Sequence, residues 1–155
     1  MAIDDVEFHN CALYESVPGT CNFEHGGCGY KEFIVDDDFN WQLQQGPTPS
    51  YYTGPDADHT YGNASGHYYY TEASAPRVNG DIATLNSPWF VSQDSQCLFT
   101  FFYHMKLSGS DPDTKLVVKQ RYDTMEEKSV GVFNSSAEDW QRGSATVSLG
   151  GEVAT

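Results

Sequence analysis

One stretch constrains the fold of this chain more than any other, the aromatic and apolar run Cys97–Met105. It contains neither glycine nor proline, and turn-forming residues flank it on both sides, which is typical of a β-strand. Its apolar residues occupy odd and even positions alike, so both faces of the strand need to be covered. We therefore expect a strand in the middle of a sheet, with a buried helix as the competing interpretation.

The rest of the chain predicts an all-β fold. Helical periodicity is nearly absent, and short runs of β-branched and aromatic residues alternate with clusters of Gly, Pro, Asn, Asp and Ser. About nine such runs suit two packed antiparallel sheets. The stretches Gly46–Asn63 and Ser108–Thr114 are predicted loops. The predicted strands are Ala2–Phe8, Asn22–Glu24, Phe39–Gln44, His67–Glu72, Asp81–Asn86, Cys97–Met105, Lys115–Tyr122, Ser129–Phe133 and Gln141–Leu149.

The charge of the chain excludes one class of partner. The 155 residues carry a formal net charge of -14, and the eight basic residues are scattered along the sequence. A surface that binds phosphates needs clustered Lys and Arg, so we expect neither nucleic acid nor an anionic membrane as a partner. No apolar run approaches the length that is needed to insert into a membrane. The excess of carboxylates is typical of a cation-binding extracellular module and equally of an ordinary soluble surface.

The cysteines favour disulfide bonds. No Cys-x-x-Cys pair occurs among the four of them, Cys11, Cys21, Cys28 and Cys97, so nothing indicates zinc or thioredoxin-like chemistry. Cys21 and Cys28 enclose six residues, two of which are Gly. A tight loop of this kind brings two Cα atoms within the distance that a disulfide needs, so we predict a bond between them.

Two N-glycosylation acceptors point to the same compartment as the disulfides. They are Asn63, in Asn63-Ala64-Ser65, and Asn134, in Asn134-Ser135-Ser136. Disulfides persist in oxidising surroundings, and N-glycans are added in the secretory pathway. The two signals together predict an extracellular location, either as a secreted protein or as the ectodomain of a membrane protein.

Several linked motifs follow one another along the chain: Cys21-Asn22-Phe23-Glu24, Cys28-Gly29-Tyr30, Asp37-Asp38-Phe39-Asn40-Trp41, Gly54-Pro55-x-x-Asp58-His59-Thr60 and Gly66-His67-Tyr68-Tyr69. In order and spacing they resemble the MAM domain family, with Tyr30 where a Trp is common. The cysteine strand Cys97–Met105 and Trp140 continue the resemblance, which covers nearly the whole chain. It implies an extracellular β-sandwich of jelly-roll type that mediates adhesion or protein contacts and has no catalytic activity.

The resemblance also implies a division of the chain. A strand like Ala2–Phe8, followed by a cysteine, closes a domain of this family at its C-terminus, whereas here it stands first. Residues 1–11 therefore resemble the end of one copy, residues 12–20 a linker, and residues 21–155 most of the next copy without its C-terminal strands. The alternative is a single domain with a permuted strand order. On the first interpretation the strand either fills the slot of its own domain or swaps into a second molecule, which gives a homodimer.

A second disulfide and a cation site follow from the resemblance. Cys97 is expected to pair with Cys11, which is also the pair left over once Cys21 and Cys28 are joined. The family favours a structural cation, for which Glu24, Asp58 and Asp4 are the candidate ligands, because Ca²⁺ prefers carboxylate and carbonyl oxygens.

The neighbouring run Asp36-Asp37-Asp38 has a plainer interpretation. We expect it to form a solvated turn. Alternatively, Asp38 caps backbone N–H groups before Phe39.

Two other functions compete with protein adhesion. An enzyme has little support, because the sequence contains no recognised catalytic motif and no thiol outside the expected disulfides. Asp58 and His59 are neighbours on an extended chain, so their side chains point to opposite sides, and His104 is expected in the core. A carbohydrate-binding jelly roll is the alternative, although most aromatic residues are expected in the core. Its stacking platform would come from Tyr51, Tyr52, Tyr68, Tyr69, Tyr70, Trp89, Phe90 and Trp140.

Overall fold

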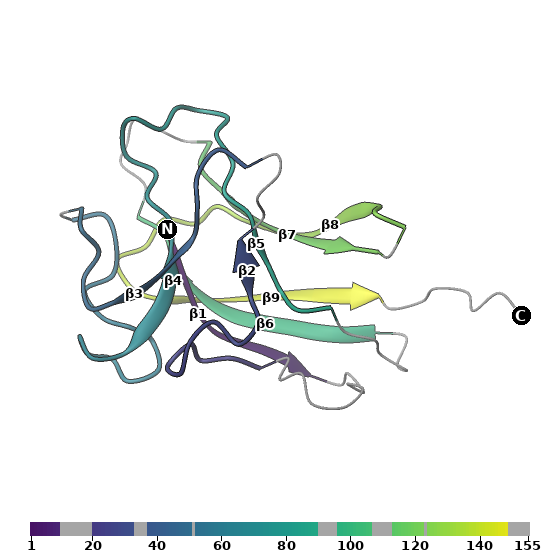
Figure 1. Ribbon diagram of the computed structural model, residues 1–155, viewed down its shortest axis with the longest axis horizontal. Coiled ribbons are helices and arrows are strands. Elements are labelled where there is room, and N and C mark those ends of the chain that lie inside the picture. Colours follow the sequence, from purple (N-terminus) through teal and green to yellow (C-terminus); the bar gives the residue numbers. More distant parts are fainter. Residues whose placement is uncertain are drawn as a thin grey trace, which may run out of the picture.

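The computed structural model describes residues 1–9, 20–32, 37–50, 52–89, 96–106, 113–122 and 124–148. These residues form strands and no helix, and every strand pairing is antiparallel (Figure 1). The all-β antiparallel class is confirmed, and the jelly-roll connectivity stays a prediction. The strands are β1 (Ala2–His9), β2 (Lys31–Glu32), β3 (Gln42–Gln45), β4 (His67–Tyr70), β5 (Leu85–Asn86), β6 (Gln96–His104), β7 (Leu116–Arg121), β8 (Glu127–Phe133) and β9 (Gln141–Ser148).

The larger sheet has five strands in the order β3-β4-β1-β6-β9. The aromatic run forms β6, which pairs with β1 on one side and with β9 on the other, so it is an interior strand as expected. Its second half is buried on both faces, but Leu98 near its start is 38% exposed. The expectation that both faces are covered therefore holds only from Thr100 onward.

The N-terminal strand β1 occupies the centre of this sheet. It pairs with β4 and with β6 of the same chain, and Val6 within it is fully buried. Closure within the chain is thus the arrangement in the structure. The strand-swapped homodimer and the division at residues 11 and 20 stay predictions.

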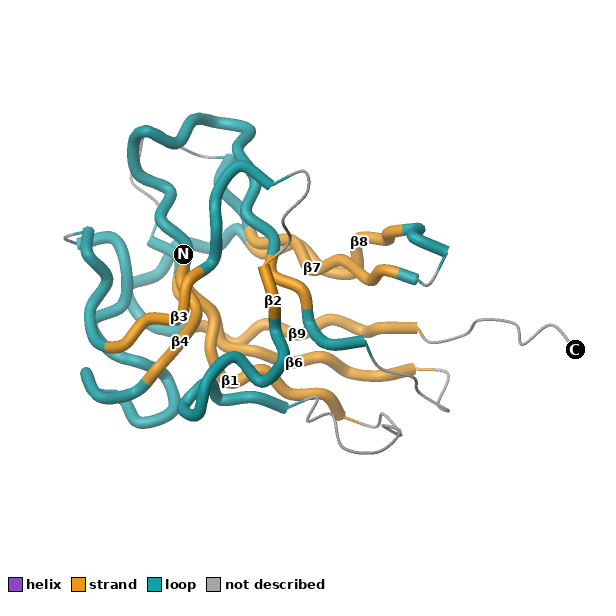
Figure 2. The backbone as a smooth tube through the Cα atoms, viewed as in Figure 1, coloured by secondary structure: helices purple, strands orange, loops and turns teal. Residues whose placement is uncertain are grey.

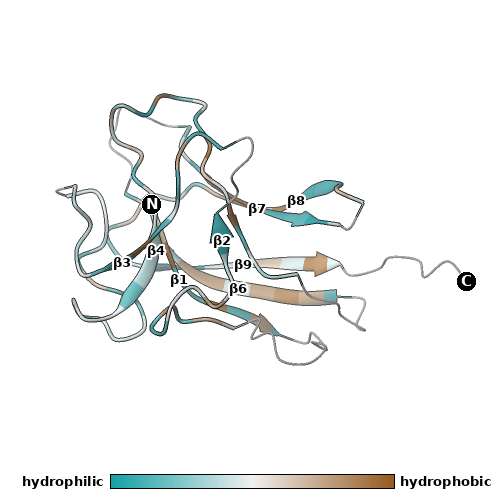
Figure 3. Ribbon diagram, in the orientation of Figure 1, coloured by the Kyte–Doolittle hydropathy of each residue, from teal (hydrophilic) through white to brown (hydrophobic). Residues whose placement is uncertain are grey.

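A second layer covers one face of the five-stranded sheet. It consists of two separate two-stranded sheets, β2-β5 and β7-β8 (Figure 2). Leu85 of β5, Leu116 of β7 and Phe133 of β8 pack against the core cluster that contains Phe101 and Tyr103 of β6. Hydrophobic residues lie along β6 and at the end of β9, whereas β2 is hydrophilic (Figure 3). The two layers agree with the predicted sandwich, but the second layer is split into two halves.

The opposite face of the five-stranded sheet is covered by the segment that follows β3. Ala2, Tyr68 and Tyr70 form a buried cluster on this face, with Trp140 packed against them. The Tyr68 hydroxyl donates to the carbonyl of Gly46 at 2.6 Å, and the Trp140 indole N–H donates to the carbonyl of Ala57 at 3.0 Å. The described part of the predicted loop Gly46–Asn63 contains no strand and lies against the sheet.

The predicted strand Asn22–Glu24 is wrong. Phe23 has a positive φ of 58°, and Glu24 lies in a turn. Only Cys21 bridges to a strand, through two backbone hydrogen bonds with Val6. The short ring that the Cys21–Cys28 disulfide closes has to reverse the chain within a few residues, which leaves no room for a strand.

Four strands, β3, β4, β5 and β7, are shorter than predicted, and β2 was not predicted. β3 begins at Gln42, β5 covers only Leu85–Asn86, and the two-residue strand β2 is too short to show a pattern. The Asp38 carboxylate accepts the N–H of Ile82 at 2.8 Å, and Asp37 accepts the N–H of Thr84 at 3.2 Å. Side chains thus bind backbone groups that a longer β5 would have paired.

These two bonds also correct the interpretation of the acidic run at this turn. Asp37 and Asp38 hold a segment that is distant in sequence, rather than forming a free turn or capping residues before Phe39. Asp36 lies outside the described residues.

Candidate functional site

Adjacent carboxylates on β1 hold the segment Asp58–His67, and a β-bulge makes this possible. Asp4 accepts the backbone N–H of His59 at 2.8 Å, and Asp5 contacts His59 Nδ1 at 2.6 Å and accepts the Thr60 hydroxyl at 2.7 Å. Side chains of neighbouring strand residues normally point to opposite faces. The pairing of β1 with β6 shifts its register between Asp4 and Glu7, and Asp5 has a positive φ of 46°. The bulge therefore lets both carboxylates reach one segment.

Asp58 organises the same segment from inside. Its side chain is fully buried, and its carboxylate accepts the N–H of Tyr61 at 2.6 Å and that of Asn63 at 3.1 Å. A Cβ atom at Gly66 would overlap the Asp58 carboxylate, so only glycine fits at this position. Asp58 thereby closes residues 58–66 into a compact loop.

Glu24 fixes the end of the segment. Its carboxylate accepts the N–H of His67 at 2.8 Å and lies 3.4 Å from His67 Nδ1. Glu24 follows the Cys21 bridge to β1, so the disulfide ring positions this carboxylate at the start of β4. We refer to Asp4, Asp5, Asp58 and Glu24 together as the carboxylate clamp.

The three predicted calcium ligands thus converge on one segment without forming a ligand cluster. Among the residues that the structure describes, no group of three or more His, Cys, Asp or Glu side chains is arranged to hold a metal ion. Calcium takes six to eight oxygen ligands. The oxygens of Glu24, Asp58 and Asp4 already accept backbone N–H groups, so these side chains by themselves do not fit such a site. The calcium site stays a prediction.

Asp4 has an unusual electrostatic environment. Burial raises the pKa of its carboxyl to about 7, although the backbone N–H of His59 opposes this rise. The neighbouring Asp5 carboxylate raises the pKa further, and the N–H groups of Asp5 and Thr60 lower it. At neutral pH the loop is therefore held by a carboxyl that is close to its midpoint of ionisation.

His59 is not part of a catalytic dyad with Asp58. Its ring stacks on Phe102 with centroids 3.5 Å apart, and its Nδ1 faces Asp5 of β1. Sequence reasoning missed this partner because the two residues are 54 positions apart; the only sequence signal was the acidic pair Asp4-Asp5.

His104 is a core residue, as expected. It is 2% exposed, and its Nε2 lies 2.9 Å from the carbonyl of Glu138. Burial lowers the pKa of its imidazole. The ring is therefore neutral at physiological pH.

One of the two predicted disulfides lies within the described residues. Cys21 is bonded to Cys28, with 6.0 Å between their Cα atoms, which confirms that prediction. Cys97 also takes part in a disulfide. Its predicted partner, Cys11, lies outside the described residues.

Most of the predicted aromatic platform belongs to the core. Tyr68 and Tyr70 are buried, and Tyr69 packs edge-on against Phe23. Tyr52 and Trp89 are exposed, and Tyr51 and Phe90 lie outside the described residues. The structure therefore does not bring these residues together as one stacking surface.

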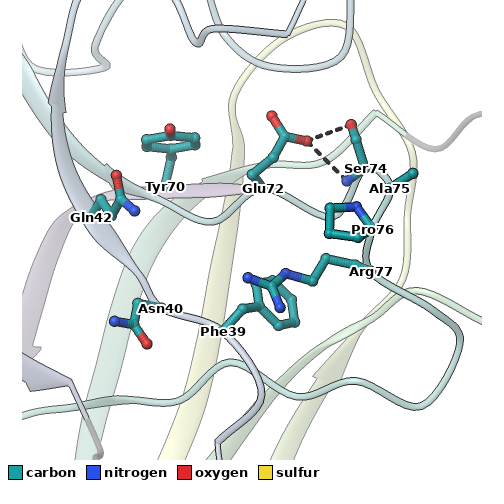
Figure 4. A pocket seen from close by; sticks show the side chains of 9 residues that line it. All are labelled: Phe39, Asn40, Gln42, Tyr70, Glu72, Ser74, Ala75, Pro76 and Arg77. Atoms are coloured by element: carbon teal, nitrogen blue, oxygen red, sulfur yellow. Dashed lines mark hydrogen bonds between the residues drawn. The ribbon is translucent and has the colours of Figure 1, made fainter.

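A small cavity of about 140 Å³ lies at the end of β3 and β4 (Figure 4). The Arg77 guanidinium stacks over the ring of Phe39, 4.8 Å from its centroid, and Glu72 accepts hydrogen bonds from the Ser74 side chain and backbone. Gln42 and Tyr70 line the opposite side. The Arg77 guanidinium and the Glu72 carboxylate are thus already in contact with Phe39 and with Ser74, respectively.

Both predicted glycosylation sites are exposed. Asn63 lies on the loop that Asp58 closes, and its side-chain oxygen accepts both the N–H and the hydroxyl of Ser65. Asn134 follows β8. Burial therefore does not prevent the attachment of a glycan to either residue. Glycosylation itself stays a prediction.

Fold and site together define a disulfide-linked β-sheet module in which buried carboxylates fix a long loop against a central strand. The chain belongs to the MAM domain family: the family model described as "MAM domain, meprin/A5/mu" matches residues 21–153. The resemblance inferred from the linked motifs is thereby confirmed. No solved structure matches the chain.

Curated relatives carry the same kind of domain within much longer proteins. Thyroid hormone-induced protein B of Xenopus laevis is 35% identical over 114 residues, which are 70% of this chain and 16% of that protein. Human MAM domain-containing protein 2 is 35% identical over 115 residues, 71% of this chain and 16% of the relative. Neuropilin-1a of Danio rerio is 42% identical over 97 residues, 63% of this chain and 10% of the relative. The chain thus spans about a sixth or less of their length. The described residues include no helix that is long and apolar enough to cross a membrane.

Proposed function

We propose that this chain is a non-catalytic extracellular module that mediates adhesion or other protein contacts. The observation that carries the proposal is the family match over residues 21–153. A disulfide between Cys21 and Cys28 and two exposed glycosylation acceptors, Asn63 and Asn134, support the extracellular location. Among the relatives, one from Rattus norvegicus is named a MAM domain-containing glycosylphosphatidylinositol anchor protein. A net charge of -14 argues against nucleic acid as a partner.

The proposal predicts that the secreted chain promotes adhesion that does not depend on glycans. Beads coated with the chain are expected to aggregate, or to capture cells, and the effect should survive removal of cell-surface glycans by glycosidases. The measurement is the fraction of aggregated beads, with beads that carry reduced and alkylated chain as the control. Adhesion that is lost with the glycans would support the carbohydrate-binding alternative. Beads that neither aggregate nor capture cells would contradict the proposal.

A structural calcium ion is a separate proposal. Calcium would have to take its remaining ligands from backbone carbonyls around the carboxylate clamp, because the side chains alone do not suffice. A cation that binds only the folded state stabilises that state by mass action, by about 2.7 kcal/mol at a hundred times its dissociation constant.

We therefore expect millimolar Ca²⁺ to raise the melting temperature relative to a chelator, and Glu24→Gln to remove most of this rise. A melting temperature that is identical in both solutions would refute the calcium proposal. It would leave the adhesion proposal untouched.

A further inference from the structure

An open groove runs between the two halves of the second layer. Its volume is about 1790 Å³. One wall is the segment 81–89, which contains β5, and the other wall is β7. The floor is apolar and belongs to the five-stranded sheet, with Phe99 and Phe101 of β6 and Val147 of β9.

The groove follows the edges of strands rather than their faces. All six residues of β7 line it, although successive residues of a strand point to opposite faces. The same holds for all nine residues from 81 to 89. A cavity touches every residue of a strand in this way when it runs along the strand's edge. Within the described residues β5 pairs only with β2, and β7 only with β8, so both walls present an edge that pairs with no described strand.

Part of the exposed lining of the groove is apolar. Val78, Ile82, Trp89 and Met125 all line it, and each is more than half exposed. They are four of the nine large hydrophobic residues that are exposed among the described residues. Apolar side chains that gather around an open strand edge favour an extended polypeptide as the ligand, rather than a polyanionic glycan.

The charge of the groove differs from that of the rest of the chain. Five of the chain's eight basic residues line it, but only four of its 22 acidic residues do. On β7 the side chains alternate: Leu116 and Val118 pack into the core, whereas Lys119 and the preceding Lys115 are exposed. Lys119 pairs with Glu127 at 3.1 Å, and Lys115 forms no ion pair with any described residue. The basic residues that line the groove are Lys31, Arg77, Lys115, Lys119 and Arg121.

We propose that this groove binds one extended strand of a partner polypeptide that is not part of these 155 residues. The strand pairs with the open edge of β7 and joins the two halves of the second layer into one sheet. Its inward side chains are apolar and pack on the floor, and its outward side chains are carboxylates that face Lys115 and Lys119. This inference rests on the proposed protein-contact function and names the chemistry of the partner segment.

A second copy of the chain is a poor occupant for the same groove. Its strand with an alternating apolar and acidic pattern is β1, which is already paired on both edges inside the five-stranded sheet. Two copies also repel each other, because each carries a net charge of -14.

The test uses a labelled peptide of about eight residues in which Val and Glu alternate, a length typical of a strand. Fluorescence anisotropy should report saturable binding of this peptide to the 155-residue chain. It should report no binding of a peptide with the same composition but with all Val residues placed together. Backbone amide signals of β7 in NMR spectra are expected to shift when the alternating peptide is added.

Two charge-reversal variants test whether the peptide binds beside β7. Lys115→Glu should lower the affinity for the alternating peptide about three- to tenfold, since it places like charges on neighbouring strands. Lys128→Glu is the matched control, because Lys128 is exposed on β8 and lies outside the groove lining; it should leave the affinity within about twofold.

Equal binding of the two peptides, or equal effects of the two variants, would overturn the inference. So would heparin binding without peptide binding, or dimerisation of the chain through β7. If the peptide fails to bind while coated beads still aggregate, the groove assignment fails and the protein-contact function stands.

Discussion

Deletion of residues 1–9 is expected to abolish the cooperative unfolding transition of the chain. β1 is the central strand of the five-stranded sheet, so its removal leaves the edge of β6 unpaired from Leu98 to His104 and takes the partners of Tyr69 and Tyr70 from β4. It also removes Asp4 and Asp5, which hold residues 59 and 60. The loss exceeds the total stability of about 5–15 kcal/mol that a domain possesses. Near-UV circular dichroism and a thermal scan should show no fixed tertiary structure and no transition.

Point variants on β1 separate this effect from general damage at the N-terminus. Val6→Ala removes methyl groups from a fully buried side chain and should cost roughly 2 kcal/mol. Glu7→Ala, next to it on the same strand, changes a side chain that is 46% exposed, and its effect should stay within about 0.5 kcal/mol. A deletion variant that melts cooperatively near the wild-type temperature would show that β1 is an accessory strand, in contradiction to its central position.

The strands that sequence reasoning found are those with a strong local pattern. The aromatic run of β6 and the alternating patterns of β1 and β9 can be recognised from the sequence, because their side chains face a core on at least one side. β2 and β5 have two residues each, and β5 is shortened by carboxylates of Asp37 and Asp38 that are far away in sequence. Periodicity within a window cannot reveal a strand end that is set by a distant side chain.

The candidate site shows the same limit. The family resemblance, together with their residue types, marked Glu24, Asp58 and Asp4 as candidates, and the structure does bring them to one segment. That Asp4 and Asp5 both reach this segment depends on the bulge in β1. A bulge changes which face a side chain reaches, and neither composition nor spacing encodes it. The family resemblance supplied the overall architecture, but the split of the second layer into two halves emerged only from the strand order.

Asp58→Ala is expected to destabilise the chain by about 2–4 kcal/mol, because it leaves the N–H groups of Tyr61 and Asn63 without their buried acceptor. This corresponds to a fall of roughly 5–15 °C in melting temperature for a chain of this size. Asp56→Ala, two residues earlier in the same loop but exposed, is the matched control and should stay within about 0.5 kcal/mol. Gly66→Ala should produce a loss comparable with that of Asp58→Ala, since its methyl group would occupy the place of the Asp58 carboxylate.

The same variants distinguish a hydrogen-bonding role of Asp58 from a metal-binding role. If the carboxylate acts through its bonds to the loop backbone, Asp58→Ala lowers the melting temperature by the same amount in chelator and in millimolar Ca²⁺. A loss that occurs only with Ca²⁺ would instead identify Asp58 as a cation ligand, since its effect would then follow the mass action of the ion. We expect a loss already in chelator, because the Asp58 carboxylate accepts two backbone N–H groups, at 2.6 and 3.1 Å; a larger loss in Ca²⁺ would add the ligand role that the calcium proposal gives to Asp58. Unchanged melting of Asp58→Ala in chelator would therefore contradict the organisation of the loop by Asp58.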